Sequence, residues 1–231
     1  MTFDLNNIKK NVLEINKELK NSGLIIQNFG NASIRYENKF YIKPSGVDLL
    51  STNYKEMVEV NIDEENNFKE LQPSVDYPTH QILYKSFPEI KSIIHTHSIY
   101  ATAFAQAEKE IRNLGTTQAD FSYGSIPITR ALTKNEVNNS YEENTGNTII
   151  EEIEKRELNC LHIPGILSIR HGVFAWGQDE HQCLKNAEII EHLAKINYIT
   201  ENINPSISEL NSYTLDKHFL RKHGPESYYG Q

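Results

Sequence analysis

The chain has 231 residues, a formal net charge of −8, and hydrophobic and charged fractions of 38% and 23%. This composition is typical of a globular domain that buries its own core, and it excludes disordered and collagen-like chains. A negative charge without a basic run argues against nucleic acid or an anionic membrane as the main partner. Neither a signal-peptide core nor a membrane span is apparent, so we expect a cytoplasmic protein in which Cys160 and Cys183 are buried thiols.

The first half of the chain predicts a helix, several short strands and two further helices. Apolar residues at three- and four-residue steps predict an amphipathic helix over 4–21, which Gly23 ends. Short β-type runs follow at 32–35, 40–43 and 57–62, and then a helix at 79–87. The run 92–97 predicts a strand that ends in histidines, and Ser98 is a suitable N-cap for an alanine-rich helix that reaches residue 107.

The second half continues the alternation of helices and strands. A polar connection that contains 145–147 precedes a short helix at 149–156, two apolar runs at 166–170 and 173–176, a long helix at 179–198, and a polar C-terminal segment. Internal repeats and shifts in composition are absent from the sequence. We therefore expect one α/β layered domain over residues 1–231.

The pair His95 and His97 indicates a metal site. Residues two apart on a strand point to the same side, so both imidazoles can reach one ion. His171 ends another β-type run, and Asp76 begins a helix after a Pro-Ser turn, so three nitrogens and one oxygen are available. Such a donor set suits Zn²⁺, Mn²⁺ or Co²⁺. An isolated His-x-His pair is more often structural, so the assignment depends on the wider pattern.

That wider pattern is a set of short motifs in a characteristic order. They are Gly30-Asn31-Ala32-Ser33, Lys43-Pro44-Ser45-Gly46, Pro73-Ser74-Val75-Asp76, His95-Thr96-His97 and His171-Gly172. Through these motifs the chain resembles the class II aldolase/epimerase family over nearly its whole length. The stretches 115–124, 215–224 and 228–231 are similar to its L-ribulose-5-phosphate 4-epimerase branch.

The resemblance implies a class II aldolase-like fold, in which helices flank a central, mostly antiparallel β-sheet. It also implies roles for individual residues. The metal ligands would be Asp76, His95, His97 and His171, with zinc as the expected ion and manganese or cobalt as alternatives. The acid/base positions match Asp120 and Tyr229. The substrate and phosphate positions match Gly30, Asn31, Lys43, Ser45, Gly46, Ser74 and His218, a set in which glycine permits close approach and lysine supplies charge.

Two residues depart from the pattern of this branch. Val75 occupies a position where many relatives have a second serine, so one hydroxyl group is missing and phosphate affinity is expected to be lower. Gln118 occupies a position where histidine is expected. Glutamine exchanges hydrogen bonds but carries no proton near neutral pH, which argues against proton transfer at this position.

The activity that the resemblance implies is the interconversion of L-ribulose 5-phosphate and D-xylulose 5-phosphate. The C4 hydrogen is not next to the carbonyl group, so inversion requires cleavage of the C3–C4 bond in a metal-assisted retro-aldol step, followed by re-addition. Two acid/base groups on different sides of the substrate are then needed. The family also suggests a homotetramer with active sites at subunit interfaces, in which the C-terminal segment, about 205–231, reaches a neighbouring subunit.

Three alternatives fit parts of the pattern. An L-fuculose-phosphate-type aldolase shares the metal and phosphate sites, but such aldolases have a glutamate proton carrier at the position of Asp76. A non-catalytic module like the adducin head need not keep the metal ligands, and all four are present here. A methylthioribulose-phosphate dehydratase is disfavoured by the epimerase-like C-terminal tail.

Overall fold

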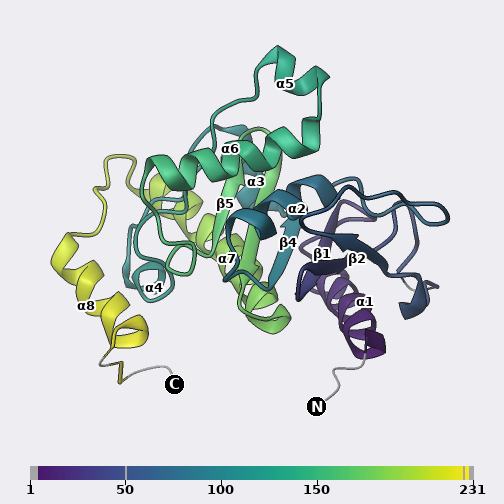
Figure 1. The fold of residues 1–231 in the computed structure, drawn as a ribbon. Coiled ribbons are helices and arrows are strands. Elements are labelled where there is room, and N and C mark those ends of the chain that lie inside the picture. The colour runs from purple at the N-terminus through teal and green to yellow at the C-terminus, as the bar shows by residue number, and fades with distance from the viewer. Residues whose placement is uncertain (1–4, 50, 226, 229–231) are drawn as a thin grey trace.

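The computed structural model describes residues 5–49, 51–225 and 227–228, which are arranged around a six-stranded sheet (Figure 1). The strand order is β3-β2-β1-β4-β6-β5, and each neighbouring pair is antiparallel. The strands are β1 (Gly30–Tyr36), β2 (Lys39–Ile42), β3 (Val58–Asn61), β4 (Ser92–Thr96), β5 (Gly165–Ser168) and β6 (Gly172–Gly177). The predicted α/β fold with a mostly antiparallel sheet is confirmed.

Alternating side chains on the central strands divide the core into two layers. Ile94 and Ala175 belong to the cluster on one side of the sheet, whereas Ile93 and Trp176 belong to the cluster on the other. This alternation follows from the two-residue period of a strand. Both sheet faces are therefore covered, which explains why β4 and β6 are buried along their whole length.

Helices cover both faces of the sheet. The helices α1 (Leu5–Asn21), α3 (Ile99–Gln106) and α7 (Glu180–Ile203) pack on the first face, and α2 (Tyr77–Ser86) and α6 (Tyr141–Lys155) pack on the second. The short elements are η1 (Tyr54–Glu56), α4 (Thr116–Ala119) and α5 (Lys134–Asn138), and the last helix is α8 (Ser212–His223). Figure 1 shows α5 projecting beyond α6, and α8 beside α4 at one side of the molecule.

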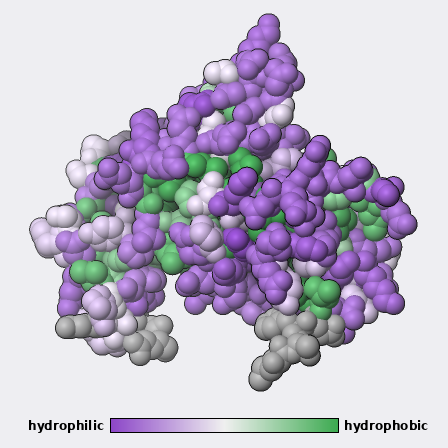
Figure 2. All heavy atoms as spheres, in the orientation of Figure 1, coloured by the Kyte–Doolittle hydropathy of each residue, from purple (hydrophilic) through white to green (hydrophobic). Residues whose placement is uncertain are grey.

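The surface agrees with this layered packing. Figure 2 shows hydrophilic side chains over most of the visible face, with apolar surface gathered beneath the ridge that contains α6. The two cysteines are buried, as predicted. Within the described part of the chain, no helix is both long and apolar enough to cross a membrane.

Two helices differ from the sequence prediction. The polar connection at 145–147 is part of α6, because Gly146 packs against α2 and needs no loop to accommodate it. The C-terminal segment, for which only polar character was predicted, contains α8, which Asn211 caps by accepting a hydrogen bond from the Thr214 N–H. One side of α8 buries Phe219, a contact that a mostly polar sequence conceals.

Candidate metal and substrate site

Three histidines meet where β4 ends and β6 begins. His95 is on β4, His97 directly follows this strand, and His171 lies in the turn between β5 and β6. Their ring centroids are 4.7 to 5.0 Å apart, and one potential ligand atom from each residue lies within 4.8 Å of the others. The chain thus brings together three of the four predicted metal ligands in one cluster, which we call the histidine cluster.

Gly172 allows the turn that carries His171 to lie against β4. A Cβ atom at position 172 would be 2.4 Å from the carbonyl oxygen of Thr96 and 3.2 Å from Cε1 of His95. Both distances are shorter than ordinary van der Waals contacts, and the nearer atom belongs to the backbone. Glycine at this position is therefore needed for the close approach of His171 to His95.

The ring of His95 is held in one orientation by two contacts. Its Nδ1–H donates a hydrogen bond to the carbonyl oxygen of Val173 at 3.0 Å, and its ring stacks on Phe174 with centroids 4.2 Å apart. This leaves Nε2 with its lone pair, 3.1 Å from Nε2 of His97. Two nitrogens on one tetrahedral zinc ion lie about 3.4 Å apart, so the two rings already have nearly the required spacing.

The protonation of the cluster also suits a cation. Burial and the neighbouring imidazoles His95 and His97 lower the pKa of His171 to about 3, and burial and His95 lower the pKa of His97. Both rings are thus neutral at pH 7, the form that binds metals. In addition, Nδ1 of His171 is buried and has no hydrogen-bond partner among the described residues. The donor set fits a divalent metal ion.

Asp76, the fourth predicted ligand, lies beside the histidine cluster but outside the 4.8 Å set. It precedes α2, and its Oδ2 accepts a hydrogen bond from Nδ2 of Asn31 at 2.6 Å. Burial alone would raise the pKa of Asp76, but the imidazoles of His95 and His80 and the bond from Asn31 outweigh burial and lower it. Asp76 is therefore a carboxylate. The amide nitrogen of Asn31, a residue predicted to bind substrate or phosphate, thus donates to this carboxylate.

The loops predicted to bind phosphate adjoin one another. The Ser74 N–H donates to the carbonyl oxygen of Lys43 at 2.9 Å, and the Ser45 N–H donates to Gln72 at 2.9 Å. Gly46 follows Ser45 in the same turn, and Gly30 begins β1 opposite Thr96. The two hydrogen bonds hold the turn at 43–46 beside residues 72–74, which precede Asp76.

Lys43 is the cation of this region. Only 3% of its surface is exposed, and burial lowers the pKa of its ammonium group, an effect that the charge of Asp76 opposes. Its ammonium group forms no ion pair with any described residue. Burying a charged lysine without an ion-pair partner costs free energy, and an anion that binds to it would offset this cost. Lys43 is therefore suited to bind an anion.

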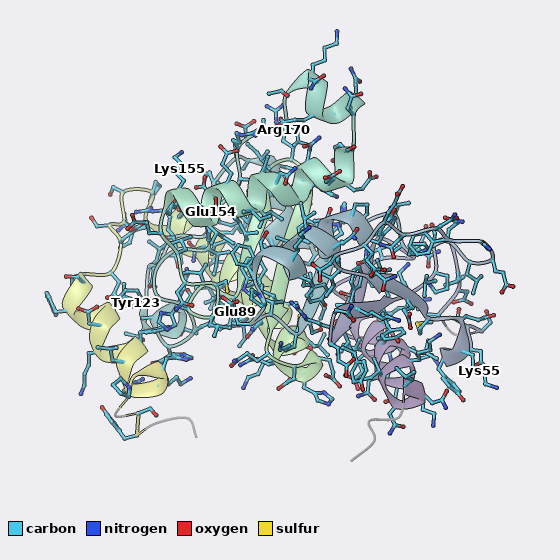
Figure 3. All side chains as sticks on the ribbon, in the orientation of Figure 1. Lys55, Glu89, Tyr123, Glu154, Lys155 and Arg170 are labelled. Carbon is cyan, nitrogen blue, oxygen red and sulfur yellow. The ribbon has the colours of Figure 1, made fainter. Side chains whose placement is uncertain are left out.

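Asp120 lies in a second group of polar residues, between α4 and α8. Its Oδ1 accepts hydrogen bonds from Nδ1 of His218 and Nε of Arg221, both at 3.1 Å, and its Oδ2 accepts one from Nη2 of Arg221 at 2.8 Å. Partial burial would raise the pKa of Asp120, but the bonds from Arg221 and His218 outweigh burial and lower it. Nearby, Tyr123 lies beside α8 (Figure 3) and donates to Asp216. Tyr229 lies outside the described residues.

The Asp120 carboxylate and the histidine cluster share no hydrogen bond within the described part of the chain. All the hydrogen bonds of the Asp120 carboxylate come from α8. Arg221 is not among the site residues predicted from the sequence. Its three-residue spacing from His218 places both on one side of a helix, a signal that becomes visible only once α8 is recognised.

Gln118 has a structural role. Its Nε2 donates to the carbonyl oxygens of Ile111 and Gly124, and its Oε1 accepts from Asn197 on α7. Its side chain is buried, and these bonds connect α4 to the preceding loop and to α7. This network accounts for a glutamine at position 118 without any part in proton transfer.

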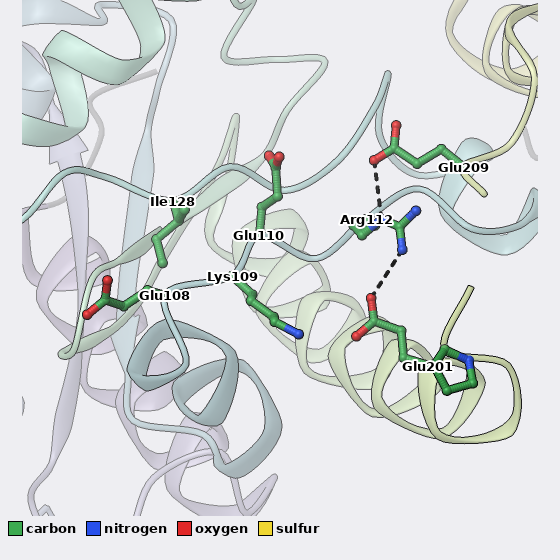
Figure 4. Close-up of a pocket in the computed structure, with 8 residues that line it drawn as sticks. Glu108, Lys109, Glu110, Arg112, Ile128, Glu201 and Glu209 are labelled. Atoms are coloured by element: carbon green, nitrogen blue, oxygen red, sulfur yellow. Dashed lines mark hydrogen bonds and ion pairs between the residues drawn. The ribbon is translucent and has the colours of Figure 1, made fainter. Parts of the chain in front are cut away.

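A separate surface pocket of about 510 Å³ lies between the 108–112 segment and the end of α7 (Figure 4). Four glutamates line it, and Arg112 lies between Glu201 and Glu209, at 3.5 and 3.6 Å. This excess of negative charge disfavours a phosphorylated sugar, so the pocket is not a candidate substrate site.

Known proteins match the chain in sequence and in fold. Residues 10–198 match the model of the Class II Aldolase and Adducin N-terminal domain. L-ribulose-5-phosphate 4-epimerase UlaF of Salmonella paratyphi C is 43% identical over 97% of this chain and 98% of its own length. Among solved structures, an L-fuculose 1-phosphate aldolase has a TM-score of 0.76 at 20% identity, covering 92% of this chain and 94% of its own. The corresponding aldolase of Thermus thermophilus has a TM-score of 0.68 at 20% identity, covering 87% and 100%.

Proposed function

Because the chain belongs to the class II aldolase and adducin family, we propose that its histidine cluster is the centre of an L-ribulose-5-phosphate 4-epimerase. One observation carries the proposal: three imidazoles, a carboxylate and a buried lysine lie together at one end of the central strands. These groups fit the two parts of a ketose phosphate, because imidazoles and a carboxylate can hold a metal for the ketose oxygens and the lysine can bind the phosphate.

The residues that would hold the ion are His95, His97 and His171, completed by Asp76. A divalent ion, which we expect to be zinc, supplies Lewis-acid stabilisation of negative charge on the oxygen atoms of a ketose. Neighbouring residues orient the proposed ligands before a metal binds: Val173 and Phe174 fix the ring of His95, and Asn31 fixes the carboxylate of Asp76. Such fixed orientation lowers the cost of binding both metal and substrate.

Lys43 is proposed to bind the phosphate group, together with Ser45 and Ser74. Replacing Lys43 with methionine should raise KM for L-ribulose 5-phosphate by about 10- to 100-fold, because a charge-assisted hydrogen bond contributes about 1.5–3 kcal/mol. Steady-state kinetics measure this change. Lys55→Met is a matched control, since Lys55 lies on η1 at the surface (Figure 3). A kcat/KM for Lys43→Met within twofold of the wild-type value would place the phosphate elsewhere.

Asp120 and Tyr229 are proposed to exchange the proton of the C4 hydroxyl group. When one of them removes this proton, the C4 oxygen forms a carbonyl group and the C3–C4 electron pair moves to the dihydroxyacetone fragment as an enediolate. The aldehyde that leaves is glycolaldehyde phosphate. After it rotates, C3 attacks its opposite face, and the second residue donates a proton to the new C4 oxygen. Atoms and charges balance, and only the configuration at C4 changes.

The ion pair with Arg221 should set the pH range in which Asp120 is a base. Arg221 lowers the pKa of Asp120, so replacing Arg221 with glutamine should raise that pKa. The acidic limb of the kcat/KM profile, where Asp120 becomes protonated, should then move to higher pH. Arg221→Lys, which keeps the charge, should move it less. If the acidic limb of Arg221→Gln stayed at the wild-type pH, this limb would not report the protonation of Asp120.

We also propose that active sites lie between subunits of a homotetramer. Two observations support this: the Asp120 carboxylate shares no hydrogen bond with the histidine cluster in the described part of the chain, and large apolar side chains within four residues of predicted site residues are exposed. These side chains are Ile26, Phe29, Val75 and Ile99. Phe29 contacts His97, with ring centroids 6.1 Å apart. A neighbouring subunit would cover this apolar surface and bring its Tyr229 to the site, with the segment 205–231 as the part that crosses.

The product identifies the reaction. Incubating the metal-loaded protein with L-ribulose 5-phosphate should yield D-xylulose 5-phosphate, detected by chromatography or NMR. Net release of dihydroxyacetone and glycolaldehyde phosphate would favour an aldolase, the activity named in the structural relatives. Metal-loaded protein that leaves the substrate unchanged would reject the epimerase proposal.

A further inference from the structure

Tyr141 lies beside the histidine cluster and has no part in the chemistry proposed above. It is the first residue of α6, and its ring is 6.1 Å from that of His171 at an angle of 45°. The side chain is 36% exposed, and its hydroxyl group makes no hydrogen bond to any residue that the structure describes. A tyrosine hydroxyl group that lies beside a polar site and has no partner there can donate a hydrogen bond to a ligand.

The position of Tyr141 is fixed by the contact between α6 and α2. A Cβ atom at Gly146 would lie 2.6 Å from the side chain of Ile82 and 3.3 Å from Cα of Thr79, so glycine permits this close packing. The hydroxyl group of Thr79 also donates to the carbonyl oxygen of Glu142, which ties the start of α6 to α2. The scaffold thus holds Tyr141 over the same face of the sheet as the metal ligands.

The order of the strands separates Tyr141 from the phosphate region. Lys43 follows β2, Asn31 is on β1, His95 is on β4, and His171 precedes β6, and these four strands are neighbours in that order. Neighbouring strands are about 4.8 Å apart, so the backbones of Lys43 and His171 are separated by three spacings, about 14 Å. Tyr141 lies at the His171 end. A ketose phosphate with its phosphate at Lys43 therefore directs its other end, C1, toward Tyr141.

We propose that the Tyr141 hydroxyl group hydrogen-bonds the C1 hydroxyl group of the pentulose phosphate and makes the site selective for 1-hydroxy ketoses. This inference rests on the proposed epimerase function. The role needs only a neutral phenol, which is the form of tyrosine at neutral pH. A site that provides a hydrogen-bond partner for a substrate hydroxyl group discriminates against the analogue that lacks it, because the partner is then left unpaired.

Two substrates and one conservative variant test the proposal. D-xylulose 5-phosphate and 1-deoxy-D-xylulose 5-phosphate differ only in the C1 hydroxyl group, and Tyr141→Phe removes only the phenol oxygen. The wild-type enzyme should prefer the hydroxylated substrate by about tenfold or more in kcat/KM, the size of one hydrogen bond. Tyr141→Phe should lose about tenfold on that substrate and little on the deoxy analogue, so the preference should fall.

Controls separate this role from a structural one. Tyr54→Phe, on η1 and packed near α1, should keep the wild-type preference, and Tyr141→Phe should bind as much metal per chain as the wild type. Equal losses on both substrates in Tyr141→Phe would overturn the proposal. So would a wild-type enzyme without preference for the hydroxylated substrate, an outcome that does not depend on how the variant folds. A wild-type enzyme that converts neither ketose would instead reject the epimerase function itself, and this inference with it.

Discussion

Purified His171→Ala protein is expected to contain little divalent metal and to lose at least about a thousandfold in epimerase activity. The loss follows because a Lewis acid contributes several kcal/mol to the stabilisation of the transition state, and each 1.4 kcal/mol corresponds to about tenfold in rate. His171 provides one of only three imidazoles in the cluster, so its removal leaves an incomplete donor set. Elemental analysis and a steady-state assay on the same sample measure both effects.

The control for this variant is His181→Ala. His181 is exposed in the first turn of α7 and lies outside the histidine cluster, so its replacement should change neither metal content nor rate. Removal of the imidazole ring at position 171 should leave the fold intact. The register of the sheet here is set by the pairing of β5 with β6 and not by the turn between them. If His171→Ala kept the wild-type metal content and rate, the histidine cluster would not be the site of the catalytic metal.

The variants Asp120→Asn and Tyr229→Phe should each be nearly inactive when pure, because each lacks one of the two proton-exchanging groups. If every active site combines Asp120 of one chain with Tyr229 of a neighbour, mixing the two variants should restore activity. After joint unfolding and reassembly, random assortment in a ring should leave about a quarter of the sites with both wild-type residues. The mixture should therefore recover about a quarter of the wild-type rate, measured against wild-type protein that was unfolded and refolded in parallel.

Each variant unfolded and refolded alone is the necessary control and should stay inactive. Mass measurement must show hybrid assemblies, so that an absence of activity cannot be attributed to a failure of subunit exchange. Hybrid assemblies without activity would mean that Tyr229 acts in the site of its own chain or has no catalytic part.

The periodic patterns of the sequence were sufficient to predict most of the strands and the common orientation of His95 and His97, whereas the antiparallel sheet was implied by the family resemblance. The two-residue period of a strand predicts that His95 and His97 reach one side, and the structure places their Nε2 atoms 3.1 Å apart. The α1 helix was equally clear, because its apolar residues recur at helical spacing over several turns. Such local patterns survive in the fold because the core on both sides of the sheet depends on them.

Several features that depend on distant parts of the chain were not predicted, although the approach of His171 to His95 and His97 was. The ion pair between Asp120 and Arg221 joins residues 101 positions apart, and no local pattern links them. The start of α6 was predicted as a loop because Gly146 usually disfavours helices, whereas here its missing Cβ makes room for α2. For the same reason no pattern in the sequence indicates that Tyr141 lies beside His171. Tertiary packing decides these positions.

Metal titration of the wild-type protein shows whether the chain needs an ion at the histidine cluster to act as an epimerase. Metal-depleted protein is given zinc in steps, and bound metal and the rate of conversion of L-ribulose 5-phosphate to D-xylulose 5-phosphate are measured in each sample. We predict no conversion at the start, a rate that rises in proportion to bound zinc, and a plateau at one ion per chain. Full conversion by protein that elemental analysis shows to be metal-free would mean that epimerisation does not require an ion at the histidine cluster.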